Sequence, residues 1–209
     1  MALQRFSLSA LTALPSKCGS ITSQEIVRFP PSAGQDSFDW QVVMATIALE
    51  GPFPVVSGAD HTVMLLEGDG VRLRAPGFDQ LLDTPHMPLS FDGDTAVACS
   101  MLGGLSIHLN LTVRRAGGRG TWRVLSDVAT LESSAHGLLM TLDGHFLVGG
   151  GTLKQGEGVW WTEEPQTWNV EPASRGARLL MLQWQPADQA SAPEDAMAEL
   201  KSIIPTQAA

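Results

Sequence analysis

The stretch Leu105-Ser106-Ile107-His108-Leu109-Asn110-Leu111-Thr112-Val113 alternates apolar and polar residues without interruption. Alternate side chains of a β-strand point to opposite faces, so this period of two predicts a strand with one apolar face and one polar face. The apolar face needs a core to cover it. The polar face must contact water or line a polar cavity, and the pattern alone leaves both alternatives open.

Short runs of the same kind continue in both directions along the chain. From Phe38, apolar residues including Trp40 alternate with Asp39 and Gln41, and turns such as Glu67-Gly68-Asp69-Gly70 separate one run from the next. Glycine tolerates the positive φ angles that tight hairpins require. This rhythm predicts an all-β sandwich or barrel. The further predicted strands are 25–29, 62–67, 71–74, 96–101, 121–131, 137–142, 145–148, 158–161, 167–171 and 177–184.

A weak internal repeat divides the chain into two similar halves. Residues 62–71 are predicted to form a strand, a glycine turn and a second strand, and residues 138–148 repeat this order. The second copy has the cadence of a cupin, which predicts a double cupin in one compact body, with modules at 1–116 and 117–209. A β-sandwich without cupin connectivity is the structural alternative.

One helix is expected, at the C-terminus. Ser191 and Glu194 have the spacing of a capping box, and Met197, Leu200 and Ile204 follow at helical spacing. The sequence therefore predicts a short C-terminal helix packed on the β-structure.

Composition excludes several classes of partner. The formal net charge is −9 and the basic residues are scattered, which disfavours nucleic acid and anionic membranes as partners. No apolar run approaches the length of a membrane-spanning helix, and Cys18 and Cys99 have no disulfide or zinc-site spacing. We expect a cytoplasmic protein, with a homodimer as an open alternative.

Several segments together resemble the HutD/Ves family, a group of cupin-like proteins linked to bacterial histidine utilisation. Their order and spacing match over roughly the first 115 residues. Gln24 and His61 depart from the family's pattern, because arginine is common at both positions. The matching segments are Lys17-Cys18-Gly19-Ser20-Ile21-Thr22-Ser23-Gln24-Glu25-Ile26, Phe38-Asp39-Trp40, Glu50-Gly51-Pro52-Phe53, Ser57-Gly58-Ala59-Asp60-His61, Leu65-Leu66-Glu67-Gly68, Phe91-Asp92-Gly93-Asp94, and His108-Leu109-Asn110-Leu111 before Arg114-Arg115.

The resemblance and the strand parity together suggest a ligand site. Asn110 and Arg114 share one face of the clean strand, and an amide beside a guanidinium suits a carboxylate or amide ligand. By resemblance, the ligand would be an intermediate of histidine breakdown such as urocanate or formylglutamate. The alternative is that Asn110 and Arg114 face solvent while Trp40 fills the core. The proposed ligand-binding residues are Glu25, Arg28, Trp40, His61, Asn110 and Arg114.

The sequence contains no catalytic motif and no convincing metal site, so we expect neither a cofactor nor catalysis. Metal-binding cupins resemble one another in a His-x-His pair, and no two histidines of this chain have that spacing. A metal-dependent isomerase or dioxygenase that used His61, Glu67 and His108 as ligands is the rival function. A third reading is a purely structural or interaction module, whose barrel interiors would be filled by side chains.

Overall fold

Strands dominate the computed structural model, which describes residues 2–12, 14–15, 21–34 and 37–187. Within these ranges the only helix is a short 3₁₀ turn, η1 (Leu8–Ala10), so the expected all-β class is confirmed. The strands are β1 (Ala2–Ser7), β2 (Leu14–Pro15), β3 (Ile21–Phe29), β4 (Trp40–Ile47), β5 (Gly51–Pro52), β6 (Ala59–Gly68), β7 (Val71–Ala75), β8 (Phe78–Leu82), β9 (Pro88–Asp92), β10 (Ala98–Met101), β11 (Ser106–Arg114), β12 (Gly118–Leu125), β13 (Ala129–Ser134), β14 (His136–Asp143), β15 (His145–Val148), β16 (Gly151–Lys154), β17 (Glu157–Thr162), β18 (Gln166–Pro172) and β19 (Arg178–Pro186).

The strands form two large and two small sheets, and the same strand order occurs twice. The large sheets have the orders β2-β3-β4-β11-β6-β9 and β1-β17-β14-β19-β12, and the small sheets have the orders β5-β10-β7-β8 and β13-β18-β15-β16. Advancing each strand from β4 to β11 by eight gives β12 to β19 with unchanged neighbours. Both halves therefore contain one eight-strand topology, which extra strands extend in the large sheets.

The first strand joins the far half of the chain. β1 pairs in antiparallel register with β17, from Ala2 opposite Thr162 to Ser7 opposite Glu157. The expected boundary between residues 116 and 117 falls in the turn between β11 and β12, so β1 belongs by sequence to one half and by hydrogen bonding to the other.

The region predicted as one strand over 121–131 is two strands in different sheets. β12 ends at Leu125 in the large sheet and β13 begins at Ala129 in the small one. The Ser126 hydroxyl donates to the Asp127 carboxylate at 2.9 Å in the corner between them. The chain therefore leaves the large sheet after Leu125 and enters the small one at Ala129.

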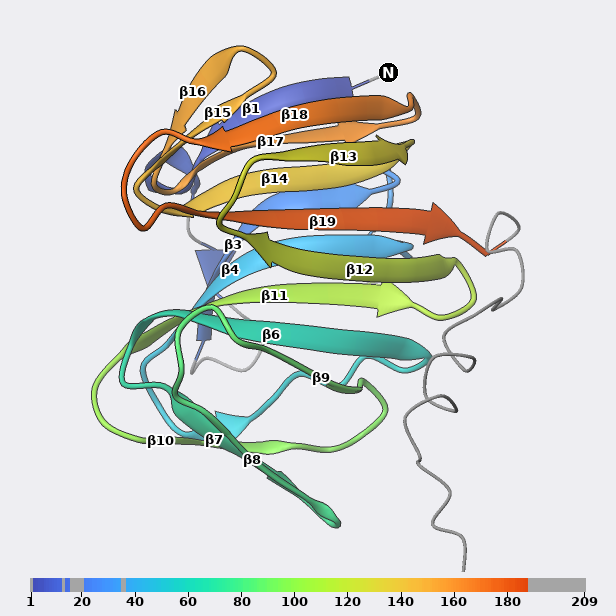
Figure 1. Ribbon diagram of the computed structural model, residues 1–209. Coiled ribbons are helices and arrows are strands. Elements are labelled where there is room, and N and C mark those ends of the chain that lie inside the picture. The colour runs from blue at the N-terminus through green and yellow to red at the C-terminus, as the bar shows by residue number, and fades with distance from the viewer. Residues whose placement is uncertain (1, 13, 16–20, 35–36, 188–209) are drawn as a thin grey trace, which may run out of the picture.

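Three buried clusters fill the spaces between the sheets, which lie in layers (Figure 1). We call the layer between the two large sheets the central interface; it contains Leu109 and Leu111 from β11 with Leu138 and Leu182 from the other large sheet. The N-terminal interior lies between the six-stranded sheet and β5-β10-β7-β8. The C-terminal interior lies between the five-stranded sheet and β13-β18-β15-β16.

The shared central interface predicts cooperative unfolding of the two halves. Because each large sheet covers the apolar face of the other, loss of one half would expose the core face of its neighbour. We expect one thermal transition in scanning calorimetry, with equal calorimetric and van't Hoff enthalpies. Two separated transitions would show that the halves are independent.

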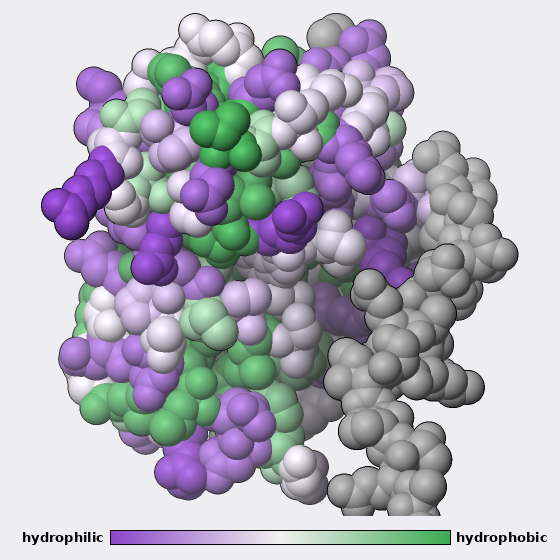
Figure 2. Space-filling view, viewed as in Figure 1, coloured by the Kyte–Doolittle hydropathy of each residue, from purple (hydrophilic) through white to green (hydrophobic). Residues whose placement is uncertain are grey.

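The predicted C-terminal helix lies outside the described residues, which end at 187. Among the described residues, no helix is long and apolar enough to cross a membrane. The face shown in Figure 2 intersperses hydrophilic residues with small hydrophobic areas.

Candidate functional site

The polar face of β11 points into the N-terminal interior. Asn110 lies opposite Val43 of β4 and Val63 of β6, and Val63 belongs to the cluster that fills this interior. Leu109 and Leu111 belong to the central interface. The alternation of residues 105–113 therefore separates a buried polar lining from a buried apolar core.

Polar side chains form adjacent rows across this lining. The first row runs over four strands and consists of Arg28, Gln41, Thr112 and His61. In the next row, Glu25 and Asn110 flank Val43. Paired residues in neighbouring strands lie on the same face of a sheet, so all these side chains point to the same side.

A β-bulge brings Glu25 and Arg28 to the same face. Residues three apart in a regular strand point to opposite faces, but the register shifts between Glu25 and Val27. Ile26 and Val27 consequently both pack in the central interface. The Arg28 guanidinium donates through Nη2 to the Glu25 carboxylate and through Nη1 to the Ala33 carbonyl oxygen at 3.2 Å.

Two histidines of the lining are buried and electrically neutral at pH 7. His61 is 3% exposed, its Nδ1 lies 3.0 Å from the Thr112 hydroxyl oxygen, and its ring contacts Phe53 and Phe91. His108 is 1% exposed. Burial lowers the pKa of each histidine to about 4, because an imidazolium loses its hydration inside the protein.

Several polar atoms of this lining have no hydrogen-bond partner within the described residues. They are Nε2 of His108, Oδ1 of Asn110 and Nε of Arg28, and all three atoms are buried. Buried polar atoms nearly always form hydrogen bonds in folded proteins, because an unpaired group loses its interaction with water. The lining therefore retains capacity to bind a polar molecule.

Arg114 and Trp40 lie away from these rows. Arg114 Nη1 donates to the Ser57 carbonyl oxygen at 3.0 Å, and its guanidinium carbon lies 5.3 Å from the centroid of the Phe38 ring. It is four residues, about 13 Å, from Asn110 along β11. Trp40 is fully buried in the central interface, on the opposite face of the sheet. The structure thus groups Glu25, Arg28, His61 and Asn110, with Arg114 at the strand end.

Sequence reasoning missed the role of Arg115. Its guanidinium donates to the carboxylates of Asp60 at 2.7 Å, Asp92 at 3.1 Å and Asp94. The hydrogen bond from the Gly58 backbone N–H is the largest cause of a lowered pKa at the Asp94 carboxyl, and the hydrogen bond from Arg115 is the second. Three of the segments that resemble HutD/Ves meet here, and they hold the start of β6 next to His61. The sequence offered one signal for this role of Arg115, namely that the three aspartates lie near turns.

The rival metal set does not converge. Glu67 pairs with Ile107 on the opposite face from His61 and His108, because a bulge in the register shifts β6 against β11. His108 is four residues, about 13 Å, from Thr112, which pairs with His61. The described residues contain no cluster of three metal-ligating side chains. Cys99 is buried, and burial raises the pKa of its thiol to about 11.

The C-terminal interior differs from the N-terminal one in chemistry. Large apolar side chains fill it, including Leu139, Phe146 and Trp161. Trp161 Nε1 donates to the Ser134 carbonyl oxygen at 2.8 Å, so this indole is satisfied. Of the two related interiors, the N-terminal one has the polar lining.

The chain is similar to known proteins in both sequence and fold. The HutD family matches residues 11–180. Protein Ves of Cronobacter sakazakii is 31% identical over 150 residues, which cover 71% of this chain and 81% of that protein. HutD of Pseudomonas fluorescens has the same fold with a TM-score of 0.79 and 20% identity, covering 88% of this chain and 99% of that chain.

A more distant structure extends the fold comparison. A cupin 2 conserved barrel domain protein of Leptotrichia buccalis has a TM-score of 0.55 and 11% identity, covering 87% of this chain and 96% of that chain. The fold is therefore cupin-like. The family match spans all the residues of the polar rows, and the Ves relative is similar over most of its own length. The chain belongs to the HutD/Ves family.

Proposed function

We propose that this protein is a non-catalytic binding protein that holds a small organic acid in the N-terminal interior. One observation carries the proposal: Glu25, Arg28 and Asn110 lie in adjacent rows of a partly buried lining, where buried polar atoms of Arg28 and Asn110 have no partner among the described residues. Binding sites commonly combine an apolar wall with a few convergent polar groups.

The Glu25–Arg28 pair selects for a particular ligand chemistry. The Arg28 guanidinium donates to a carboxylate, and the Glu25 carboxylate accepts from an N–H group of the same ligand. A ligand that carries both groups can engage the pair without leaving either charge unpaired. Urocanate and formylglutamate each have a carboxylate and an N–H, which agrees with the link between HutD/Ves proteins and histidine utilisation.

The repeated eight-strand order supports a double cupin, with the N-terminal module as the binding module and the C-terminal module as its packed partner. We place the protein in the cytoplasm in a regulatory role. The net charge of −9 argues against nucleic acid as the partner. A homodimer is compatible with this proposal.

Calorimetric titration of urocanate and formylglutamate tests the proposed site. The variant Arg28→Ala is expected to bind urocanate about 10- to 100-fold more weakly, because a charge-assisted hydrogen bond to the ligand is lost. Glu25→Gln should weaken urocanate while leaving cinnamate, which has a carboxylate but no N–H, unchanged.

Arg74→Ala is the matched control, because Arg74 is exposed on the small sheet. Thermal melting of each variant separates loss of binding from loss of folding. Equal affinities of Arg28→Ala and Arg74→Ala for urocanate would contradict the proposed site. So would a wild-type protein that binds none of these acids.

A further inference from the structure

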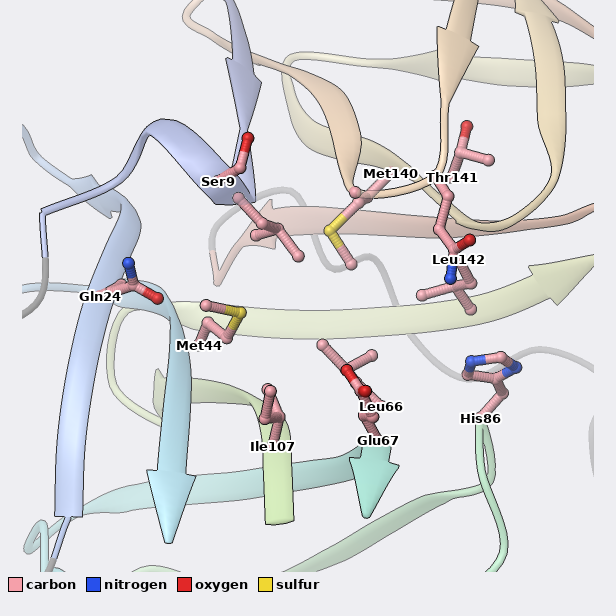
Figure 3. A pocket seen from close by; sticks show the side chains of 13 residues that line it. Ser9, Gln24, Met44, Leu66, Glu67, His86, Ile107, Met140, Thr141 and Leu142 are labelled. Atoms are coloured by element: carbon pink, nitrogen blue, oxygen red, sulfur yellow. The ribbon is translucent and has the colours of Figure 1, made fainter. Parts of the chain in front are cut away.

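A second cavity lies at the edge of the central interface, on the face of the six-stranded sheet that points away from the polar rows. Its volume is about 380 Å³, within the range of small-molecule sites. Residues from η1, both large sheets and the segment before β9 surround it (Figure 3). It shares no residue with the Glu25–Arg28 site.

The cavity has an apolar and adaptable wall. Met44 and Ile107 cover one side from the six-stranded sheet, and Met140 and Leu142 face them from β14 (Figure 3). Methionine side chains are flexible and polarizable, so they adjust to ligands of different shape. This wall suits a hydrocarbon body and does not define its exact outline.

Hydrogen-bond acceptors lie at the two ends of this wall. Glu67 is the only carboxylate among the described residues that line the cavity, and it is exposed at the end of β6. At the other end, Gln24 Nε2 donates to the Leu11 carbonyl oxygen at 2.7 Å, which leaves its amide oxygen as an acceptor pointing toward the cavity (Figure 3). Gln24 and Glu67 are three strands apart, about 14 Å across the sheet, and two residues apart in register, about 7 Å along it.

A strained histidine marks the Glu67 end. His86 has a φ angle of 65°, in the left-handed region that non-glycine residues rarely adopt. Its backbone N–H donates to the Leu65 carbonyl oxygen at 3.0 Å, and its Nδ1 lies 3.3 Å from the Asp143 carboxylate of β14. Contacts from both halves of the chain therefore hold His86 at the rim. Strained backbone of this kind concentrates at ligand sites.

We propose that this cavity binds a small primary amine with an apolar body, with the ammonium group on Glu67 and the hydrocarbon between Met44 and Met140. Charge complementarity decides the class of ligand: the lining carries a carboxylate and amide oxygens, and the net charge of the chain is −9. An anionic ligand would meet Glu67 with like charge. The His86 ring borders this end of the cavity, where its Nδ1 already lies 3.4 Å from Arg178 Nη1.

Methyl-labelled methionine provides a direct readout with hexylamine as the probe. The chain contains eight methionines, of which Met44 and Met140 line the cavity. We expect hexylamine to shift the methyl signals of these two most strongly, with assignments from Met44→Leu and Met140→Leu. Glu67→Gln should weaken hexylamine between about three- and tenfold and leave hexanol unchanged, because only the ion pair is lost.

Glu171→Gln is the matched control, because Glu171 is exposed on β18 in the far small sheet. Each of three results would overturn the proposal: unshifted Met44 and Met140 signals, hexanoate binding as tight as hexylamine binding, or equal hexylamine affinity in Glu67→Gln and Glu171→Gln. Because the two sites lie on opposite faces of one sheet, the urocanate titration neither supports nor weakens this result.

Discussion

Replacement of Trp40 by alanine is expected to lower the free energy of unfolding by about 3 to 5 kcal/mol. Trp40 is 0% exposed and lies in the central interface, with its ring centroid 6.1 Å from that of Phe29 and 6.4 Å from that of Trp184. Removal of the indole leaves a cavity between two sheets that cannot close without moving both. Urea denaturation, followed by circular dichroism, measures the change.

Two further variants define what this effect means. Leu49→Ala should change the free energy of unfolding by less than about 0.5 kcal/mol, because Leu49 is 62% exposed. Trp40→Phe keeps an aromatic ring in the central interface and should bind urocanate like the wild type, since Trp40 lies on the opposite face from Asn110. If Trp40→Ala lowers the free energy of unfolding as little as Leu49→Ala does, the assignment of Trp40 to the core is wrong.

Strand parity predicted the division of faces because regular strands obey a period of two. The alternation of residues 105–113 correctly separates Leu109 and Leu111, which pack between the large sheets, from Asn110, which points into the N-terminal interior. The sequence left open whether that polar face meets solvent or a cavity. Only the pairing of β11 with two neighbours, and the small sheet over them, decides it.

Local irregularities explain most of what could not be predicted. The bulge near Ile26 makes partners of Glu25 and Arg28, and another bulge turns Glu67 away from His108. Neither bulge can be recognised from the hydrophobic pattern of the sequence. The pairing of β1 with β17 is equally hidden, because a strand's partner depends on the folded chain and not on its own residues.

The two halves share a topology and differ in what fills them. The C-terminal interior packs Phe146 and Trp161, whereas the corresponding space in the N-terminal half receives His61, His108 and Asn110. Buried polar groups reduce stability unless they are paired, so their retention in one interior favours a binding role there.

The same buried histidines predict a marked loss of stability in mild acid. The unfolded chain binds protons to these imidazoles at the ordinary pKa of 6.5, whereas in the folded protein their pKa values are about 4. Below pH 6.5 the unfolded state therefore binds more protons than the folded state, and stability falls with pH until both forms are protonated near pH 4. The stability from this source is fully present above pH 6.5.

The expected loss is about 2 kcal/mol per histidine at pH 5 and about 3 kcal/mol per histidine below pH 4. Urea denaturation between pH 7.5 and 4 measures it. His61→Phe and His108→Leu should each reduce the slope between pH 6.5 and 4, because each removes one buried proton acceptor. Burial also lowers the pKa values of His86 and His136, so part of the slope remains in both variants. His145→Gln, which replaces an exposed histidine on β15, should retain the full slope.

The Asp94 carboxylate, whose pKa is lowered, adds its own loss only at lower pH. If His61→Phe, His108→Leu and His145→Gln all retain the wild-type slope, the imidazoles of the N-terminal interior are hydrated, and the buried polar lining on which the binding site rests is wrong.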